Sequence, residues 1–193
     1  ALLDLSTGEF WIEESDDAAA LGDNLLRYGP SECILPEELY DDTAFRALLR
    51  PGSELVLSRQ EDWIFEPDVA EDVLLRHFSV ASLAGFGCEA ASAGVGAAGA
   101  VLYYVSKELR HRVGHVTRLR MRNPAAYMLL DETTIANLDL VSLRRPGRDG
   151  GGPNLLKTLD ATRTALGGRM LRHWLLRPLL VLDAIRARHD VRE

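Results

Sequence analysis

LDATRTALGGRMLRHWLLRPL, residues 159–179, decides how the end of this chain folds. Asp160, Thr162 and Thr164 are all residue types that cap the N-terminus of a helix. Apolar residues then recur at three-to-four-residue spacing, as on the buried face of a helix: Leu166, Met170, Leu171, Trp174 and Leu175. Pro178 cannot continue a helix, so we expect the helix to end at about Arg177.

The first half of the chain alternates predicted strands and predicted helices. Segments 2–5 and 10–12 are typical of two strands joined by a turn that contains Gly8. Apolar periodicity and Gly or Pro breaks outline the other elements. Predicted helices cover residues 17–28, 37–49, 68–78 and 89–110, and predicted strands cover 33–35, 54–57 and 116–122. This alternation favours an α/β layer architecture.

The helix predicted at 68–78 has one apolar face and one charged face. We expect its core-facing residues to be Val69, Val73, Leu74 and Phe78. We expect its outward-facing residues to be Glu71, Asp72, Leu75 and Arg76.

The composition is that of an ordinary globular protein, with 47% hydrophobic and 26% charged residues. Cys33 and Cys88 are too few for a disulfide framework and lack metal-ligand spacing, so we expect two buried, unreactive thiols in a reducing compartment. The longest uncharged run, residues 90–106, is short of a membrane span, and the N-terminus carries no export signal. We therefore expect a soluble cytoplasmic protein with no membrane partner.

Charge is distributed unevenly along the chain, whose net charge is -7. Residues 1–106 contain 5 Lys or Arg against 20 Asp or Glu, and residues 107–193 contain 17 against 9. An acidic half repels phosphates and suits a protein surface better than duplex DNA. Two interpretations of the basic half stay open, a solvated or internally paired face and direct contact with DNA.

Gly94, Gly96 and Gly99 match the glycine spacing of dinucleotide-binding loops. That pattern works when a strand precedes it and an acid about 20 residues downstream holds the ribose. Residues 85–89 are not an apolar strand, and residues 113–122 contain no acid. We interpret the glycines as positions where a helix packs closely on a sheet, and we expect no cofactor.

His111 and His115 stand four residues apart, as two zinc ligands on one helical turn would. Arg110 and Arg112 flank them, and no third ligand is near in the sequence. We interpret the pair as the solvated basic end of a helix, and His173 as an exposed helix residue. The sequence therefore predicts no metal site here.

Asp4, Glu89 and Asp131 are the carboxylates that could serve a metal-dependent nuclease, because an α/β domain that opens with a strand hairpin resembles the ribonuclease-H-like fold. Two-metal catalysis needs such acids clustered at adjacent strand ends. Asp4 is as easily a turn residue before Ser6-Thr7-Gly8. No nucleophile elbow, P-loop or catalytic Cys/His spacing occurs in the sequence. We expect no catalytic residue, and a free-standing nuclease is the alternative.

Several anchors spread over the whole chain resemble the MutS family of DNA mismatch-recognition ATPases. In chain order they are residues 3–10, 30–35, 85–87, 128–139 and 159–179. Asp139, where the family usually has Glu, and Pro153-Asn154 are mild departures.

The resemblance implies two domains. Residues 1–116 would form a ribonuclease-H-like connector, a mixed sheet with flanking helices whose first strand is missing. Residues 117–193 would begin an all-α core, or lever, domain with a mobile loop at 144–153. The chain would then be a non-catalytic, cofactor-free fragment, whereas the intact protein would bind ATP and Mg, contact mismatched duplex DNA through the missing domains, and form a homodimer at the nucleoid.

By the same resemblance, the connector couples mismatch binding to the ATPase and carries a docking surface for MutL, the downstream repair partner. Glu71 and Asp72 occupy the matching outward positions. The resemblance also makes seven residues a structural junction: Asp160, Thr162, Thr164, Gly167, Arg169, Trp174 and Pro178. Trp174 is expected to anchor its helix, and Arg169 is either a buried pairing partner or an exposed residue.

Overall fold

The chain folds as two compact units that interleave in sequence. The computed structural model describes residues 1–15, 17–49, 55–88, 92–122, 126–142 and 152–190. Unit 1 comprises Ala1–Asp16, Glu32–Arg46 and Leu57–Arg122, and unit 2 comprises Asp17–Ser31, Ala47–Val56 and Asn123–Glu193. The boundary expected at residue 117 stays a prediction. The mobile loop predicted at 144–153 falls mostly on residues 143–151, outside the described ones.

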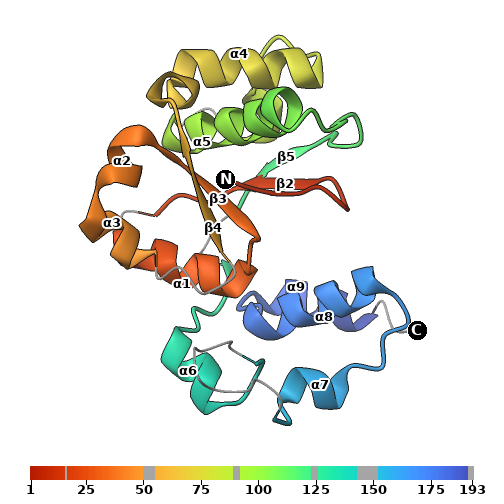
Figure 1. The fold of residues 1–193 in the computed structure, drawn as a ribbon. Coiled ribbons are helices and arrows are strands. Elements are labelled where there is room, and N and C mark those ends of the chain that lie inside the picture. The colour runs from red at the N-terminus through yellow and green to blue at the C-terminus, as the bar shows by residue number, and fades with distance from the viewer. Residues whose placement is uncertain (16, 50–54, 89–91, 123–125, 143–151, 191–193) are drawn as a thin grey trace. The chain divides into compact units, whose positions relative to one another are not determined.

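A three-stranded mixed sheet, in the order β1-β2-β5, lies at the centre of unit 1. β1 (Leu2–Asp4) and β2 (Glu9–Ile12) form an antiparallel hairpin, and β5 (Leu119–Met121) runs parallel to β2 (Figure 1). β3 (Glu32–Pro36) and β4 (Val56–Gln60) form a separate two-stranded sheet. The strand expected at 54–57 is β4, which begins at Val56. Residue 54 lies outside the described residues.

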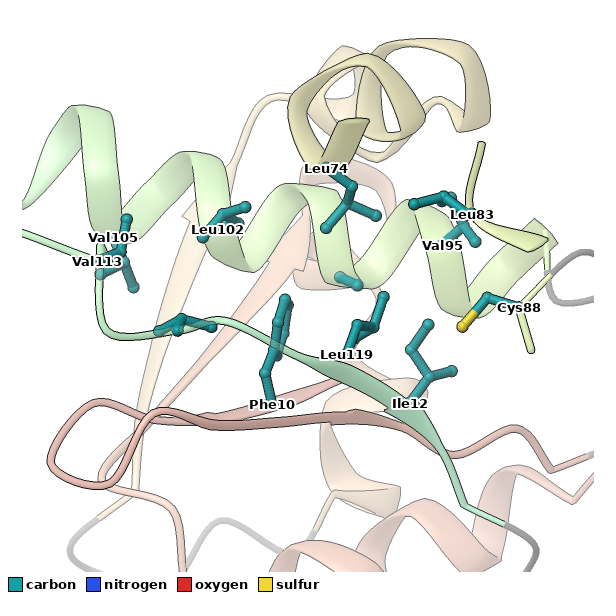
Figure 2. Packing of buried hydrophobic residues seen from close by; sticks show 12 residues of the cluster. Phe10, Ile12, Leu74, Leu83, Cys88, Val95, Leu102, Val105, Val113 and Leu119 are labelled. Carbon is teal, nitrogen blue, oxygen red and sulfur yellow. The ribbon is translucent and has the colours of Figure 1, made fainter. Parts of the chain in front are cut away.

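Two helices cover one face of the three-stranded sheet. α5 (Ser92–Tyr103) packs on the sheet, and α4 (Pro67–Phe78) packs on α5 (Figure 1). Figure 2 shows the apolar cluster around α5, to which Phe10 of β2 and Leu119 of β5 contribute from the sheet and Leu74 contributes from α4. Each fully buried side chain of this kind contributes roughly 1.5–3 kcal/mol. The cluster therefore fixes α4 relative to the sheet, and the mixed α/β class is confirmed.

The single helix predicted over 37–49 is wrong, because the chain forms α2 (Glu37–Asp41) and α3 (Thr43–Leu48) instead. Asp42 has an extended backbone between them, and its Oδ1 accepts hydrogen bonds from the N–H groups of Ala44 at 2.8 Å and Phe45 at 3.1 Å. Aspartate side chains compete in this way for the free N–H groups at a helix start.

The helix predicted at 89–110 ends earlier than expected. The regular α-helix, α5, ends at Tyr103, and a π-helical turn, η3 (Tyr104–Glu108), follows it. Residues 89–91, at the start of the predicted helix, lie outside the described ones. Arg110 has φ of 53°, which takes the chain out of the helix. On α4, Leu75 packs against the core, contrary to the outward position predicted for it, and the small Ala70 is fully buried.

Unit 2 is mainly helical. Its helices are α1 (Ala18–Tyr28), α6 (Glu132–Asn137), α7 (Leu155–Leu159), α8 (Ala165–Leu176) and α9 (Leu182–Asp190). Its buried cluster contains Leu130, Ile135, Val141 and Leu176. Short 3-10 turns, η1 (Asp62–Phe65) and η2 (Ala84–Phe86), complete unit 1. No helix among the described residues has both the length and the apolar character to cross a membrane.

Candidate functional site

Glu71 and Asp72 lie on the exposed side of α4, where the sequence placed them. Asp72 Oδ2 forms an ion pair with Arg76 Nη2 at 3.0 Å, one helical turn away, and both side chains are well exposed. An exposed pair of this kind contributes only about 0–1 kcal/mol. Asp72 can therefore exchange Arg76 for a cation of another molecule at little cost, and the docking role of both residues stays a prediction.

α4 holds this acidic face rigidly. Ala70 and Leu74 are fully buried on its inner side. Gly99 of α5 allows the close approach, since a Cβ there would overlap the Cα of Ala70. At the C-terminal end, Ser79 adopts the left-handed conformation and Leu75 accepts its backbone N–H. The acidic side chains are thus presented on a fixed backbone.

The glycine pattern of α5 serves close packing, as interpreted from the sequence. A Cβ at Gly94 would overlap the Ile12 side chain, and one at Gly96 would overlap the carbonyl oxygen of Phe65. The contacts therefore reach η1 and α4 as well as the sheet. The N–H of Gly94 donates to Glu14 Oε1 at 2.7 Å, which places a carboxylate at the N-terminal end of α5.

The two histidines considered as zinc ligands lie beyond the helix, because η3 ends at Glu108. The interpretation of His111 and His115 as a helix end is therefore wrong. His115 Nε2 lies at hydrogen-bond distance, 2.7 Å, from the carbonyl oxygen of Leu5. Within the described parts of the chain, no group of three His, Cys, Asp or Glu residues is arranged to hold a metal ion.

The described nuclease candidates each have a structural partner. Asp4 Oδ1 accepts hydrogen bonds from Ser6 N at 2.8 Å and Ser6 Oγ at 2.6 Å, which forms the hairpin turn. Asp131 caps α6 by accepting from Thr134 N at 2.7 Å, and hydrogen bonds from Thr134 hold the pKa of Asp131 below its usual value. Glu89 lies outside the described residues.

Burial raises the pKa of both cysteine thiols, which disfavours the reactive thiolate. Cys88 is buried, whereas Cys33 is only partly buried, so the expectation of two buried thiols is wrong for Cys33. Neither forms a disulfide.

The Asp-x-Thr-x-Thr pattern of residues 160–164 forms the start of α8. Thr164 caps the helix by accepting the N–H of Gly167 at 3.0 Å. Asp160 Oδ1 accepts from Thr162 N at 3.0 Å and Thr162 Oγ1 at 2.6 Å, and these bonds lower the pKa of Asp160. A Cβ at Gly167 would lie 3.2 Å from Thr164 Oγ1 and 3.3 Å from Thr162 Cβ. The glycine therefore leaves room for both threonines, which explains their joint occurrence.

The end of α8 also follows the prediction, with the last helical residue at Leu176. The carbonyl oxygen of Pro178 accepts Met128 N at 2.8 Å, and Leu179 forms an antiparallel bridge with Tyr127. The Arg188 guanidinium lies 4.5 Å from the ring centre of the half-buried Trp174.

The buried stripe predicted for α8 is wrong in its first turns. Leu166 and Met170 are 57% and 51% exposed, whereas Leu176 is buried in the cluster of unit 2. Arg169 is exposed, as in the second of the two alternatives left open for it. The buried cluster in the described part of unit 2 is small, and the residue of α8 that belongs to it is Leu176, at the end of the helix.

Sequence reasoning missed Arg177, which is only 3% exposed. Its guanidinium carbon lies 4.0 Å from the ring centre of Tyr28 and 5.6 Å from that of Tyr127. Both tyrosines are far away in sequence, so no local pattern links them to an arginine before a proline. Arg177 thus ties α1, the segment after residue 126 and the end of α8 together within unit 2.

Comparisons with known proteins match both parts of the chain to one family. The model of MutS domain II matches residues 1–117, and that of MutS domain III matches residues 133–193. The DNA mismatch repair protein MutS of Desulfosudis oleivorans is 41% identical over 194 residues, covering 98% of this chain and 21% of that protein. Its counterpart in Flavobacterium psychrophilum is 35% identical over 192 residues, covering 99% and 21%.

MutS of Methanococcoides burtonii is 34% identical over 196 residues, covering 100% of this chain and 22% of that protein. The chain thus spans about a fifth of the length of these curated relatives. Since the domain II match alone covers more than half of its residues, and relatives above 30% identity cover nearly all of it, the chain belongs to the MutS family.

Proposed function

We propose that this chain is the connector and the beginning of the core of a mismatch-repair MutS, and that it transmits state changes rather than catalysing a reaction. The two family matches follow each other in chain order, which supports this assignment. On this proposal the connector has a ribonuclease-H-like fold. The mixed order β1-β2-β5, covered by α5 and α4, supports that finer fold.

The partner proposed for the connector is MutL, docked on the acidic face of α4. The observation that carries this proposal is the exposure of Glu71 and Asp72 on a helix whose opposite side is fully buried. A rigid helix loses little conformational entropy on binding, and an acidic face attracts a basic protein surface. The charge of the first 106 residues, with 20 Asp or Glu against 5 Lys or Arg, supports a protein partner over DNA.

The mechanism proposed is a change between two arrangements of the intact protein. Nucleotide-driven motion of the core would reorient the connector and expose the docking face, which is coupling between two distinct sites. ATP with Mg, mismatched duplex DNA and a second copy of the chain are ligands and partners proposed for the intact cytoplasmic protein. Residues 1–193 would contribute the connection between them.

A binding titration of the intact protein with MutL, in the presence of mismatched DNA and ATP, tests the docking face. Reversal of Glu71→Lys together with Asp72→Lys places like charges against a basic partner. We expect Kd to rise at least tenfold, which corresponds to about 1.4 kcal/mol.

The matched control reverses Glu38→Lys and Asp41→Lys on α2, two exposed acids of the same unit. At physiological salt the control should leave Kd within about threefold, because charges away from the contact are then largely screened. Equal weakening by both double variants would contradict docking on α4. Unchanged binding by both would do so as well.

A further inference from the structure

A groove of about 550 Å³ borders β5. Its lining comes from the turn at Gly85–Gly87 on one side and from residues 118–121 on the other. Gly85 and Gly87 have open space where a Cβ would stand, so Phe86 is the one residue of this turn that brings a side chain to the groove. All of these residues belong to unit 1.

β5 is an edge strand of the described sheet, because it pairs only with β2. Arg122 N donates to the carbonyl oxygen of Ile12 at 2.8 Å, and Met121 is the register partner of Ile12. In a parallel ladder, alternate residues point their N–H and C=O groups to the same neighbour. Those of Leu119 and Met121 therefore point away from β2. Between described residues, no backbone hydrogen bond connects this outer edge to another segment.

Arg118 and Arg120 give one side of this edge a positive charge. They lie on the sheet face opposite the buried Leu119, at the alternate spacing that separates same-face side chains by about 7 Å. Both are exposed, and neither forms an ion pair with any residue that the structure describes. Residues 109–130 contain no Asp or Glu at all. Among the residues that the structure describes, these two arginines are therefore not neutralised by an ion pair.

The other side of the edge is apolar. Met121 shares the face of Leu119 and is 40% exposed, and Phe86 in the adjoining turn packs against the core. A strand lying along β5 would therefore meet guanidinium groups on one face and apolar side chains on the other.

We propose that this groove binds an extended acidic peptide segment, which adds to β5 as a further strand. Carboxylates at alternate positions of such a segment have the same spacing as Arg118 and Arg120, and cross-strand pairs of opposite charge are favourable. Apolar residues at the intervening positions cover Met121, while the main chain hydrogen-bonds to the free edge. This surface is distinct from the acidic face of α4 and selects the opposite charge.

The edge favours a peptide over a nucleic acid. A phosphate backbone would leave the N–H and C=O groups of Leu119 and Met121 without partners. It would also bring a continuous run of negative charge to a chain whose first 106 residues carry a large acidic excess. A short peptide with two or three carboxylates meets less of this repulsion.

Fluorescence anisotropy with the intact protein tests the proposal, using a labelled peptide of alternating glutamate and valine as the probe. Arg118→Gln combined with Arg120→Gln should raise Kd about fivefold, as expected for two lost cross-strand charge pairs. The matched control is Arg110→Gln with Arg112→Gln, which removes the same charge from exposed positions of the same segment outside the groove. The control should change Kd less than twofold.

Peptides N-methylated at alternate residues test the strand addition without altering the protein. Methylation of the set of N–H groups that faces β5 should abolish binding, while methylation of the other set should preserve it. Equal effects of both sets, or equal effects of both arginine pairs, would overturn the proposal. Loss of oligothymidylate binding in the Arg118→Gln, Arg120→Gln variant, with no peptide binding by the unaltered protein, would overturn it in favour of a nucleic-acid surface.

Discussion

Asp160 reports on the start of α8 through its carboxyl group. The hydroxyl of Thr162 is the main cause of its lowered pKa, followed by the backbone N–H of the same residue. Because its pKa is lower in the folded state, Asp160 stabilises the fold at any pH above its pKa in the unfolded chain. This stabilisation is lost as the pH falls through its pKa in the folded protein. We expect Thr162→Val to raise the pKa of Asp160 towards its ordinary value, measured by a carboxyl NMR titration from about pH 2 to 6.

Thr158→Val is the control for this titration, because the Thr158 hydroxyl donates to the carbonyl oxygen of Asn154 instead. It should leave the pKa of Asp160 where it is. An unchanged pKa in Thr162→Val would show that the hydroxyl is not what lowers the pKa of Asp160.

Arg177 should matter more to unit 2 than an ordinary helix-end arginine. A desolvated guanidinium over an aromatic ring is stabilised by about 2 kcal/mol or more. Arg177→Ala should therefore speed amide hydrogen exchange in α8 and in residues 126–128 about thirtyfold in the intact protein. Arg186→Ala, at an exposed arginine of α9, should change exchange less than about twofold. Equal protection in the two variants would refute the role given to Arg177.

At the scale of elements, the contact between α4 and α5 depends on Gly99. Gly99→Ala gains about 1 kcal/mol of helix propensity, but its Cβ overlaps the backbone of Ala70, which no side-chain rotation relieves. Overpacking costs typically 1–3 kcal/mol, so the unfavourable effect should win. We expect faster hydrogen exchange throughout α4. Gly85→Ala is the control, since open space surrounds that position. Faster exchange of α4 in Gly85→Ala, with no change in Gly99→Ala, would contradict the argument.

Elements were predictable where their signals are local. Thr164 and Pro178 set the limits of α8, and both act within one turn of the helix. Asp42 broke a predicted helix because its side chain caps α3, a competition that apolar periodicity does not register. The exposure of Leu166 was not predictable from spacing either, because periodicity marks an apolar face but not what covers it.

At the scale of the whole molecule, the interleaving of two units was beyond local sequence signals. Residues 17–31 and 47–56 join unit 2, although the sequence places both inside the first predicted domain. The contact of Arg177 with Tyr28 joins two distant segments within unit 2. Such contacts join residues far apart in the chain, so neither propensity nor periodicity contains them.

The acidic excess of the first 106 residues gives a kinetic prediction for docking to MutL. A field summed over many charges steers association, whereas contacts at the interface set dissociation. Glu71→Lys with Asp72→Lys and the control Glu38→Lys with Asp41→Lys change the charge by the same amount. At low salt both double variants should associate with MutL more slowly than the unaltered protein, by a similar factor of up to about tenfold. Added salt should make the three association rates equal.

Only the α4 variant should also speed dissociation, because only it alters the proposed contact. Stopped-flow association and displacement experiments on the intact protein at two salt concentrations separate the two rates. Faster dissociation in both variants would place the contact on a wider surface than α4. Faster dissociation in neither would reduce the role of the acidic face to steering alone, and the docking site would have to lie elsewhere on the protein.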